Sequence, residues 1–310
     1  MTVEGGHVAE ILHKRSGVSP LWIPPWPSIE PSTYSPAQHP EYGDNNESRL
    51  LSGIMGHNLC LDLFGTPSDA ESAAGISVHG EAPVVPYEVV AAGDTITARC
   101  TLPQAQLRFE RSLKLTNGDV HFEETVENLS AFDRPSAWTQ HVTLGPPFLE
   151  RGVTQFRAPG TKSRDLATNK DFDWPAALET YTKAESSGGF TTHLMDPHRT
   201  EAYFYAFSPT SKVLFGYVWK RTDFPWLGIW EENHSRDHAP WNKRALTRGM
   251  EFGASPFPET RRQMIERREL FGVPGYRWIP AKSKVHVEYH AFIRTAARIP
   301  ETLEEAEALP

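Results

Sequence analysis

Cysteine is scarce in this chain of 310 residues. Cys60 and Cys100 are the only two cysteines, and no Cys-x-x-Cys spacing occurs. A disulfide framework or a zinc knuckle needs more thiols at closer spacing, so the sequence predicts neither of them. We expect the protein to work in a reducing compartment, the cytoplasm.

Long hydrophobic runs and long basic runs are also missing. No stretch reaches the roughly 20 apolar residues of a membrane-spanning helix, and residues 1–7 lack the basic and apolar regions of an export signal. The formal net charge is −8, and no group of lysines and arginines is long enough to neutralise a run of phosphates. We therefore expect neither a membrane nor a nucleic acid as partner.

Signature motifs of nucleotide, cofactor and metal chemistry are absent as well. The chain has no GxGxxG after a strand, no Walker loop, no GxSxG elbow and no HExxH. His234 and His238 resemble an inverted zinc-protease pattern, but Pro240 interrupts the helix that would turn both rings toward one metal. The sequence therefore predicts no cofactor and no metal.

Alternation of apolar and polar side chains is the dominant pattern that is present. Residues 95–102, 107–115 and 120–128 alternate with a period of two, which is typical of half-buried strands, and Asn117-Gly118 favours a tight hairpin turn. Further strands are predicted at residues 200–208, 212–220, 262–269 and 283–294. Short helices are expected only within residues 174–186 and 301–310. Because no repeat or linker interrupts the chain, we expect one all-β domain, residues 1–310.

Three short segments place a catalytic type of residue beside glycine or proline. His79 precedes Gly80, which permits close approach of a ligand, and Glu81 can bind a hydroxyl. His141 stands near the end of a predicted strand. Glu251 is surrounded by small and apolar residues, which would raise its pKa toward the range useful for a base.

The order of these segments resembles the galactose mutarotase (aldose 1-epimerase) superfamily. A histidine before glycine, a second histidine ending a strand after Asn128-Leu129-Ser130, and a distal glutamate follow one another in the same sequence, and the resemblance spans about residues 5–294. It implies a β-supersandwich of large, mainly antiparallel sheets, with a sugar bound on the concave face of one of them. It also implies cofactor-free interconversion of sugar anomers.

The resemblance further implies roles for individual residues. Glu251 would be the general base on the anomeric hydroxyl, and His141 the general acid on the ring oxygen. His79 would steady the ring oxygen or a neighbouring hydroxyl. Arg49 lies upstream of the first histidine, as a substrate-binding arginine does in the family, and we assign Arg49 and His57 to substrate binding.

Aromatic and acidic residues near the end of the segment 220–232 suit a sugar as ligand. Trp230 can stack on the C–H face of a sugar while Glu231 binds its hydroxyls. An equally weighted interpretation is a core strand with Trp226 and Trp230 packed on one face, since their separation of four is even.

Other functions remain open at this point. One is a carbohydrate-binding protein without catalysis. Another is a glycoside hydrolase, which would pair Glu251 with Glu81 or Glu231. A phosphorylated sugar is also conceivable, although solvated loop charge explains the cations as well. The cations in question are Lys220, Arg221, Lys243, Arg244 and Arg248.

Overall fold

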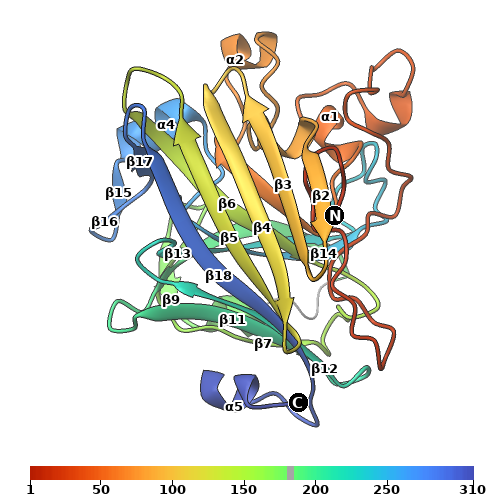
Figure 1. The fold of residues 1–310 in the computed structure, drawn as a ribbon. Helices are drawn as coiled ribbons and strands as arrows, with labels where there is room; N and C mark the ends of the chain where they lie inside the picture. The colour runs from red at the N-terminus through yellow and green to blue at the C-terminus, as the bar shows by residue number, and fades with distance from the viewer. Residues whose placement is uncertain (180–184) are drawn as a thin grey trace.

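Two large β-sheets make up most of the computed structural model, which describes residues 1–179 and 185–310 (Figure 1). Each large sheet contains eight strands, and all of the described strand pairs are antiparallel. No helix of the described part is long and apolar enough to cross a membrane. The predicted all-β class is confirmed.

The first sheet, which carries the candidate site, has the order β1-β6-β14-β13-β10-β8-β9, with β17 paired to β6. Its strands are β1 (His57–Asp62), β6 (Arg134–Leu144), β8 (Gly160–Asp165), β9 (Asp171–Asp173), β10 (Ser187–Met195), β13 (Trp226–Asn233), β14 (Leu246–Gly253) and β17 (Arg277–Ile279).

The second sheet has the order β2-β3-β4-β5-β18-β12-β11-β7. Its strands are β2 (Glu88–Ala92), β3 (Thr95–Leu102), β4 (Leu107–Thr116), β5 (Asp119–Asn128), β7 (Gln155–Arg157), β11 (Glu201–Ser208), β12 (Val213–Lys220) and β18 (Lys284–Thr295). In Figure 1 the strands β3, β4, β5 and β18 run side by side across the front of the molecule.

The remaining elements are short. They are η1 (Pro40–Tyr42), α1 (Ser48–Leu51), α2 (Asp69–Ala73), η2 (Ala82–Val84), α3 (Ala176–Glu179), α4 (Arg261–Arg267), α5 (Leu303–Glu307) and the hairpin of β15 (Glu269–Leu270) with β16 (Val273–Pro274). The helices α3 and α5 fall within the two predicted helical segments, and residues 180–184 of the first lie outside the described part.

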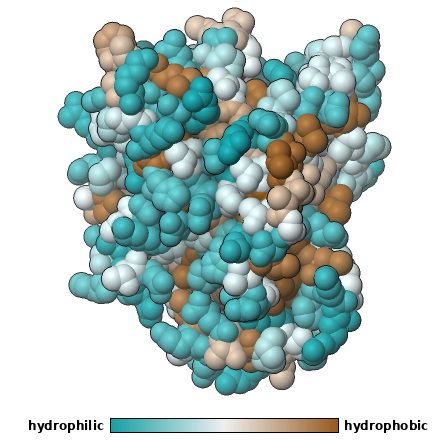
Figure 2. Space-filling view, in the orientation of Figure 1, coloured by the Kyte–Doolittle hydropathy of each residue, from teal (hydrophilic) through white to brown (hydrophobic). Residues whose placement is uncertain are grey.

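The main hydrophobic core lies between the two large sheets. Alternation directs one side of each strand inward, so aromatic residues of both sheets meet there; Trp219 of β12 stacks on Phe252 of β14 with ring centroids 4.2 Å apart. Smaller hydrophobic clusters cover parts of the outward sides, as under α5, while the face drawn in Figure 2 is mainly hydrophilic with separate hydrophobic groups. The strand period of two therefore explains the core between the sheets, while strands such as β1 and β14 are buried on both sides.

A buried polar network crosses this core. The Glu124 carboxylate of β5 accepts hydrogen bonds from Arg111 Nε (2.8 Å), Trp138 Nε1 (3.0 Å), Gln140 Nε2 (2.7 Å) and the Tyr289 hydroxyl (2.6 Å). Arg111 and Glu124 have side chains only 1% and 0% exposed. Such a buried ion pair is tolerable only when its polar atoms are satisfied, as they are in this network.

One predicted strand is wrong. Residues 262–269 form mainly the helix α4, which begins after Thr260. The Thr260 side chain accepts from the Gln263 backbone, and the Gln263 side chain accepts from the Thr260 backbone, which is a capping box. Only Met264 of this helix is buried, so a polar surface helix was mistaken for an alternating strand. Near the N-terminus, Glu4 and Val8 form isolated bridges with Pro86 and His57.

Candidate functional site

The floor of the candidate site is built from neighbouring strands of the first sheet. Asn58 of β1 is paired with His141 of β6, and Gly249 of β14 is paired with Thr143 of β6. Because side chains alternate along a strand, His141 and Glu251 project from the same face of the sheet. His141 Nε2 and Glu251 Oε1 consequently lie 3.1 Å apart, with the two side chains 6% and 2% exposed.

His79 approaches this pair from a tight turn. Its backbone has φ of 68°, and Ser77 and Gly80 form an isolated bridge on either side of it. Its Nδ1 lies 2.5 Å from the Phe64 carbonyl oxygen, which can only accept, so Nδ1 carries a proton and Nε2 is free for a ligand. The rings of His79 and His141 have centroids 5.0 Å apart.

Two neighbours hold the His141 ring in place. Its Nδ1 lies 3.0 Å from Thr143 Oγ1 and 3.3 Å from Asn58 Nδ2. In the neutral ring, Nδ1 can accept from Asn58 Nδ2 while Nε2 carries the proton; in the imidazolium, Nδ1–H donates to Thr143 Oγ1 and Nε2–H faces Glu251. The pair Asn58 and Thr143 thus orients His141 toward the carboxylate.

Burial shifts the pKa values of Glu251 and His141 in opposite directions. It raises the pKa of the Glu251 carboxyl well above its usual value, because the charged form loses water without gaining a counter-ion of fixed charge. It lowers the pKa of His141 well below its usual value, and nearby His79 lowers it further. Burial also lowers the pKa of His79. Such shifts in one cleft mark a candidate site for proton transfer.

Gly249 gives the Glu251 carboxylate its space. It lies two residues before Glu251 on the same face of β14, and a methyl group placed there would overlap with Glu251 Oε1. We expect Gly249→Ala to displace the carboxylate and lower kcat/KM of any reaction at this site by about tenfold to a hundredfold. Gly189→Ala is the matched control, since a methyl group at that lining position meets nothing within 4 Å. Equal activity of both variants would contradict the placement of Glu251.

The floor of the candidate site opens into a cleft of about 550 Å³. His79, His141 and Glu251 line it together with Trp230, whose ring centroid lies 5.8 Å from that of His141. Trp241 borders the cleft beside Trp230, with centroids 5.9 Å apart. A cleft of this size with convergent polar groups and aromatic walls fits a small organic ligand.

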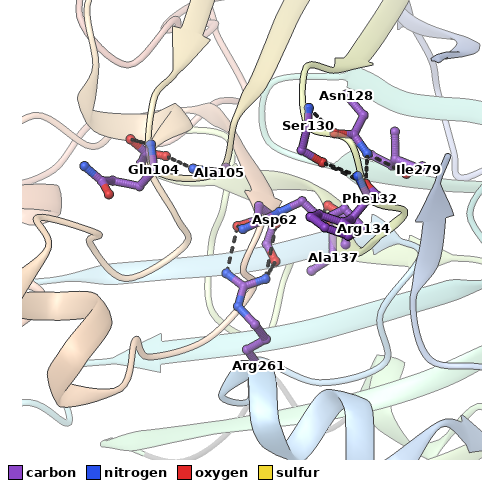
Figure 3. Close-up of polar contacts among 12 residues, drawn as sticks. Asp62, Gln104, Ala105, Asn128, Ser130, Phe132, Arg134, Ala137, Arg261 and Ile279 are labelled. Atoms are coloured by element: carbon purple, nitrogen blue, oxygen red, sulfur yellow. Dashed lines mark hydrogen bonds and ion pairs between the residues drawn. The ribbon is translucent and has the colours of Figure 1, made fainter. Parts of the chain in front are cut away.

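The segment that carries His79 is fixed at both ends. Asp62, where β1 ends, accepts hydrogen bonds from Arg134 and from Arg261 Nη2, the latter at 2.7 Å (Figure 3). At the other end, Glu81 accepts from the backbone amides of Gln104 (3.2 Å) and Ala105 (2.8 Å). These charge-assisted contacts hold the turn of His79 over the sheet.

Comparisons with known proteins give the fold but no sequence family. No family model matches the chain, and no curated protein matches it. A solved structure from Klebsiella pneumoniae subsp. pneumoniae, described as a proposed aldose 1-epimerase, has a TM-score of 0.72 at 15% identity and covers 95% of this chain and 76% of its own. A galactose mutarotase-like protein from Clostridium acetobutylicum has a TM-score of 0.61 at 13% identity, covering 94% and 90%.

A third solved structure, a proposed aldose 1-epimerase from Escherichia coli, has a TM-score of 0.59 at 10% identity, with 91% of this chain and 94% of that chain covered. The chain has a galactose mutarotase-like fold. This mutarotase-like fold confirms the predicted supersandwich of large antiparallel sheets.

The mutarotase-like fold brings five of the eight predicted site residues to the cleft. They are His79, His141, Trp230, Glu231 and Glu251. His141 and Glu251 lie inside strands rather than on loops, and the sheet itself therefore sets their spacing. Trp226 and Trp230 do share a face of β13, but Trp226 is fully buried while Trp230 reaches the cleft.

The other three predicted residues lie away from the cleft lining. His57 precedes Asn58 in β1 and so faces the core, where its ring nitrogens bond to Tyr217 (3.0 Å) and Gln140 (2.9 Å). Glu81 is engaged with backbone amides, as described above. Arg49 points its Nε toward the Pro31 carbonyl oxygen at 3.3 Å. Each of the three has a structural partner in the protein.

None of the five cations considered for a phosphate lines the cleft. Arg248 is buried and donates to the carbonyl oxygens of Ala177 and Leu178. Among the described lining residues the one Lys or Arg is Arg236, which was not among the predicted site residues. Asn58 and Thr143 were also missed, although the period of two from His141 points directly to Thr143. Among the described residues, no group of three His, Cys, Asp or Glu could hold a metal ion.

Proposed function

We propose that the protein is an aldose 1-epimerase-like enzyme that interconverts sugar anomers by general acid and base catalysis. The observation that carries this proposal is the buried pair of His141 Nε2 and Glu251 Oε1, 3.1 Å apart at the floor of an open cleft. In this proposal residues 1–310 act as a single sugar-binding domain in the cytoplasm, with an aldose or a sugar derivative as substrate and no cofactor.

The reaction opens and closes a cyclic hemiacetal. Glu251 takes the proton of the anomeric hydroxyl while the bond from C1 to the ring oxygen breaks, and His141 delivers a proton to that oxygen. Rotation about the bond from C1 to C2 turns the aldehyde over, and the reverse transfers close the ring as the other anomer. His79, with Nε2 free, steadies the ring oxygen or a neighbouring hydroxyl. Each positioned group contributes roughly 10²–10⁴-fold.

The pH dependence follows from the single proton that His141 and Glu251 share. The pair must hold one proton more than a neutral imidazole and a carboxylate together hold. Two additional protons leave no base, and no additional proton leaves no acid. The lowered pKa of His141 sets the acid limb below pH 6.5, and the raised pKa of Glu251 sets the alkaline limb well above pH 4.5. We expect a bell-shaped profile of kcat/KM, measured by polarimetry with the uncatalysed rate subtracted. An acid limb above pH 6.5 would contradict this assignment.

The test of the proposed function is anomer exchange in a panel of free aldoses, followed by polarimetry or NMR. We expect acceleration by the wild type and a loss of about 10²–10⁴-fold in His141→Ala. His286→Ala is the matched control, because this exposed histidine lies on the other sheet. Sugar binding without acceleration would leave a carbohydrate-binding protein. Release of new reducing ends would favour a hydrolase using Glu251 and Glu231, because Glu81, the other predicted partner of Glu251, does not line the cleft.

A further inference from the structure

One wall of the cleft is hydrocarbon where a charged side chain was expected. The helix α1 and the residues after it present Leu50, Leu51 and Ile54 to the cleft, while Arg49 of the same helix turns toward Pro31. These three residues belong to a hydrophobic cluster with Val78 and several tryptophans. The segment therefore offers no hydrogen-bonding side chain to a ligand from these three positions.

A second hydrophobic cluster borders the same cleft. Phe64 and Phe190 pack edge to face with centroids 5.9 Å apart, and both line the cleft. Leu166, which is 37% exposed, adds another apolar lining side chain. Trp230 packs against both clusters. A ligand that enters meets apolar surface from two separate clusters.

Three charged residues of the lining, Arg236, Glu47 and Glu232, are engaged with one another. Arg236 lies 3.1 Å from Glu47 and 3.5 Å from Glu232, and its guanidinium stacks over the Trp241 ring at 4.7 Å. Glu232 also accepts from the Ser235 amide at 2.7 Å and the Ser235 hydroxyl at 2.6 Å. Glu231 Oε1 lies 3.4 Å from Arg248. Besides the groups that the proposed chemistry uses, the described lining offers a ligand chiefly the hydroxyl of Thr66 and the carboxylate of Glu231, whose side chain is 15% exposed.

A fully hydroxylated hexose fits such a cleft poorly. Each of its hydroxyls loses water on binding and needs a hydrogen-bond partner in exchange, whereas a methyl group gains from contact with Leu, Ile and Phe. We propose that the substrate is an aldose in which an apolar group replaces at least one hydroxyl, with a 6-deoxyhexose as its simplest form. This inference rests on the proposed function, whose acid and base it uses unchanged.

Matched sugar pairs test the substrate class directly. D-galactose is compared with its 6-deoxy form, D-fucose, and D-glucose with 6-deoxy-D-glucose, using exchange NMR at subsaturating sugar. We expect kcat/KM to be about tenfold higher or more for the 6-deoxy member of at least one pair. Equal or lower values for the deoxy member of both pairs would overturn the inference while leaving anomer exchange itself established.

Methyl glycosides separate binding from catalysis, because they cannot open their rings. Titration of the cleft tryptophan fluorescence should show tighter binding of methyl 6-deoxy-β-D-galactoside than of methyl β-D-galactoside, again by about tenfold. Tighter binding of the deoxy glycoside together with no anomer exchange for any sugar would overturn the epimerase proposal and keep the ligand class. No preference in binding or in exchange would overturn the ligand class.

Substitutions of Leu51 and Ile54 test whether the apolar wall causes the preference for a deoxy sugar. Leu51→Asn supplies an amide to the wall and should reduce the preference for the deoxy sugar at least several-fold. Ile54→Thr is the second variant, because its smaller change of shape keeps the cluster packed if Leu51→Asn unfolds. Leu115→Asn is the control, since Leu115 is 54% exposed on β4 of the other sheet. An unchanged preference in both folded wall variants would contradict the role of this wall.

Discussion

Glu251→Gln should abolish anomer exchange and at the same time stabilise the protein. Glutamine keeps the shape of the side chain but cannot take the proton of the anomeric hydroxyl, so we expect kcat to fall by about 10²–10⁴-fold. Polarimetry or exchange NMR measures the loss. Sugar binding should persist, because the cleft walls and His79 are unchanged.

The gain in stability follows from the raised pKa of Glu251. A carboxyl whose folded pKa lies above its unfolded pKa binds more protons in the folded state, so stability falls as pH rises above the unfolded value of 4.5. Glutamine removes that penalty, and at neutral pH we expect a gain of about 0.5–2 kcal/mol in the free energy of unfolding. The gain should shrink as the pH approaches 4.5.

Urea unfolding of both proteins at two pH values measures this difference. Glu288→Gln is the control, since that side chain is 71% exposed and should give no pH-dependent gain. An active Glu251→Gln variant would remove Glu251 from the mechanism. An inactive variant without a gain in stability would show that the buried carboxyl is not destabilising.

Glu124→Gln should destabilise the protein by about 3–5 kcal/mol, because it leaves the Arg111 guanidinium as an uncompensated charge in the core. The same change disturbs the acceptors of Trp138 and Tyr289, which lie between the two sheets. Urea unfolding gives the free energy of unfolding. An unchanged m-value would show that wild type and variant expose the same amount of surface on unfolding, so that their free energies can be compared. Circular dichroism first confirms that the variant folds.

Glu110→Gln is the matched control for this loss. Glu110 of β4 pairs with Arg99 of β3 at 2.7 Å, but both side chains are about half exposed, so water screens the pair. We therefore expect a much smaller change in the free energy of unfolding there than in Glu124→Gln. Equal losses in Glu110→Gln and Glu124→Gln would mean that burial does not decide the strength of these ion pairs.

Much of the fold could be predicted from the strand period. The hairpin of β4 and β5 around Asn117 and Gly118 matches its prediction within one residue at either end. The segment of α4 could not be assigned by the same rule, because its capping box is local chemistry that a period of two does not detect. Alternation and local caps thus carry different information.

The site was less accessible to sequence reasoning, for a reason visible in β1. His57 and Asn58 are adjacent, and the sheet sends one to the core and the other to His141. Choosing between the faces requires knowing which residues of β6 lie opposite, and that register comes only with the fold. Glu81 illustrates the same limit, since the amides that it binds belong to residues more than twenty positions away.

The most direct test of the account is the anomer exchange rate, measured by exchange NMR, in the wild type, His141→Ala, Glu251→Gln and the double variant. Two groups that share one proton act as a unit, so the double variant should lose little more than the worse single variant. Acceleration in the wild type with this pattern is the result that we predict. Single-variant losses that multiply in the double variant, or no acceleration of any sugar that binds, would contradict catalysis by the pair.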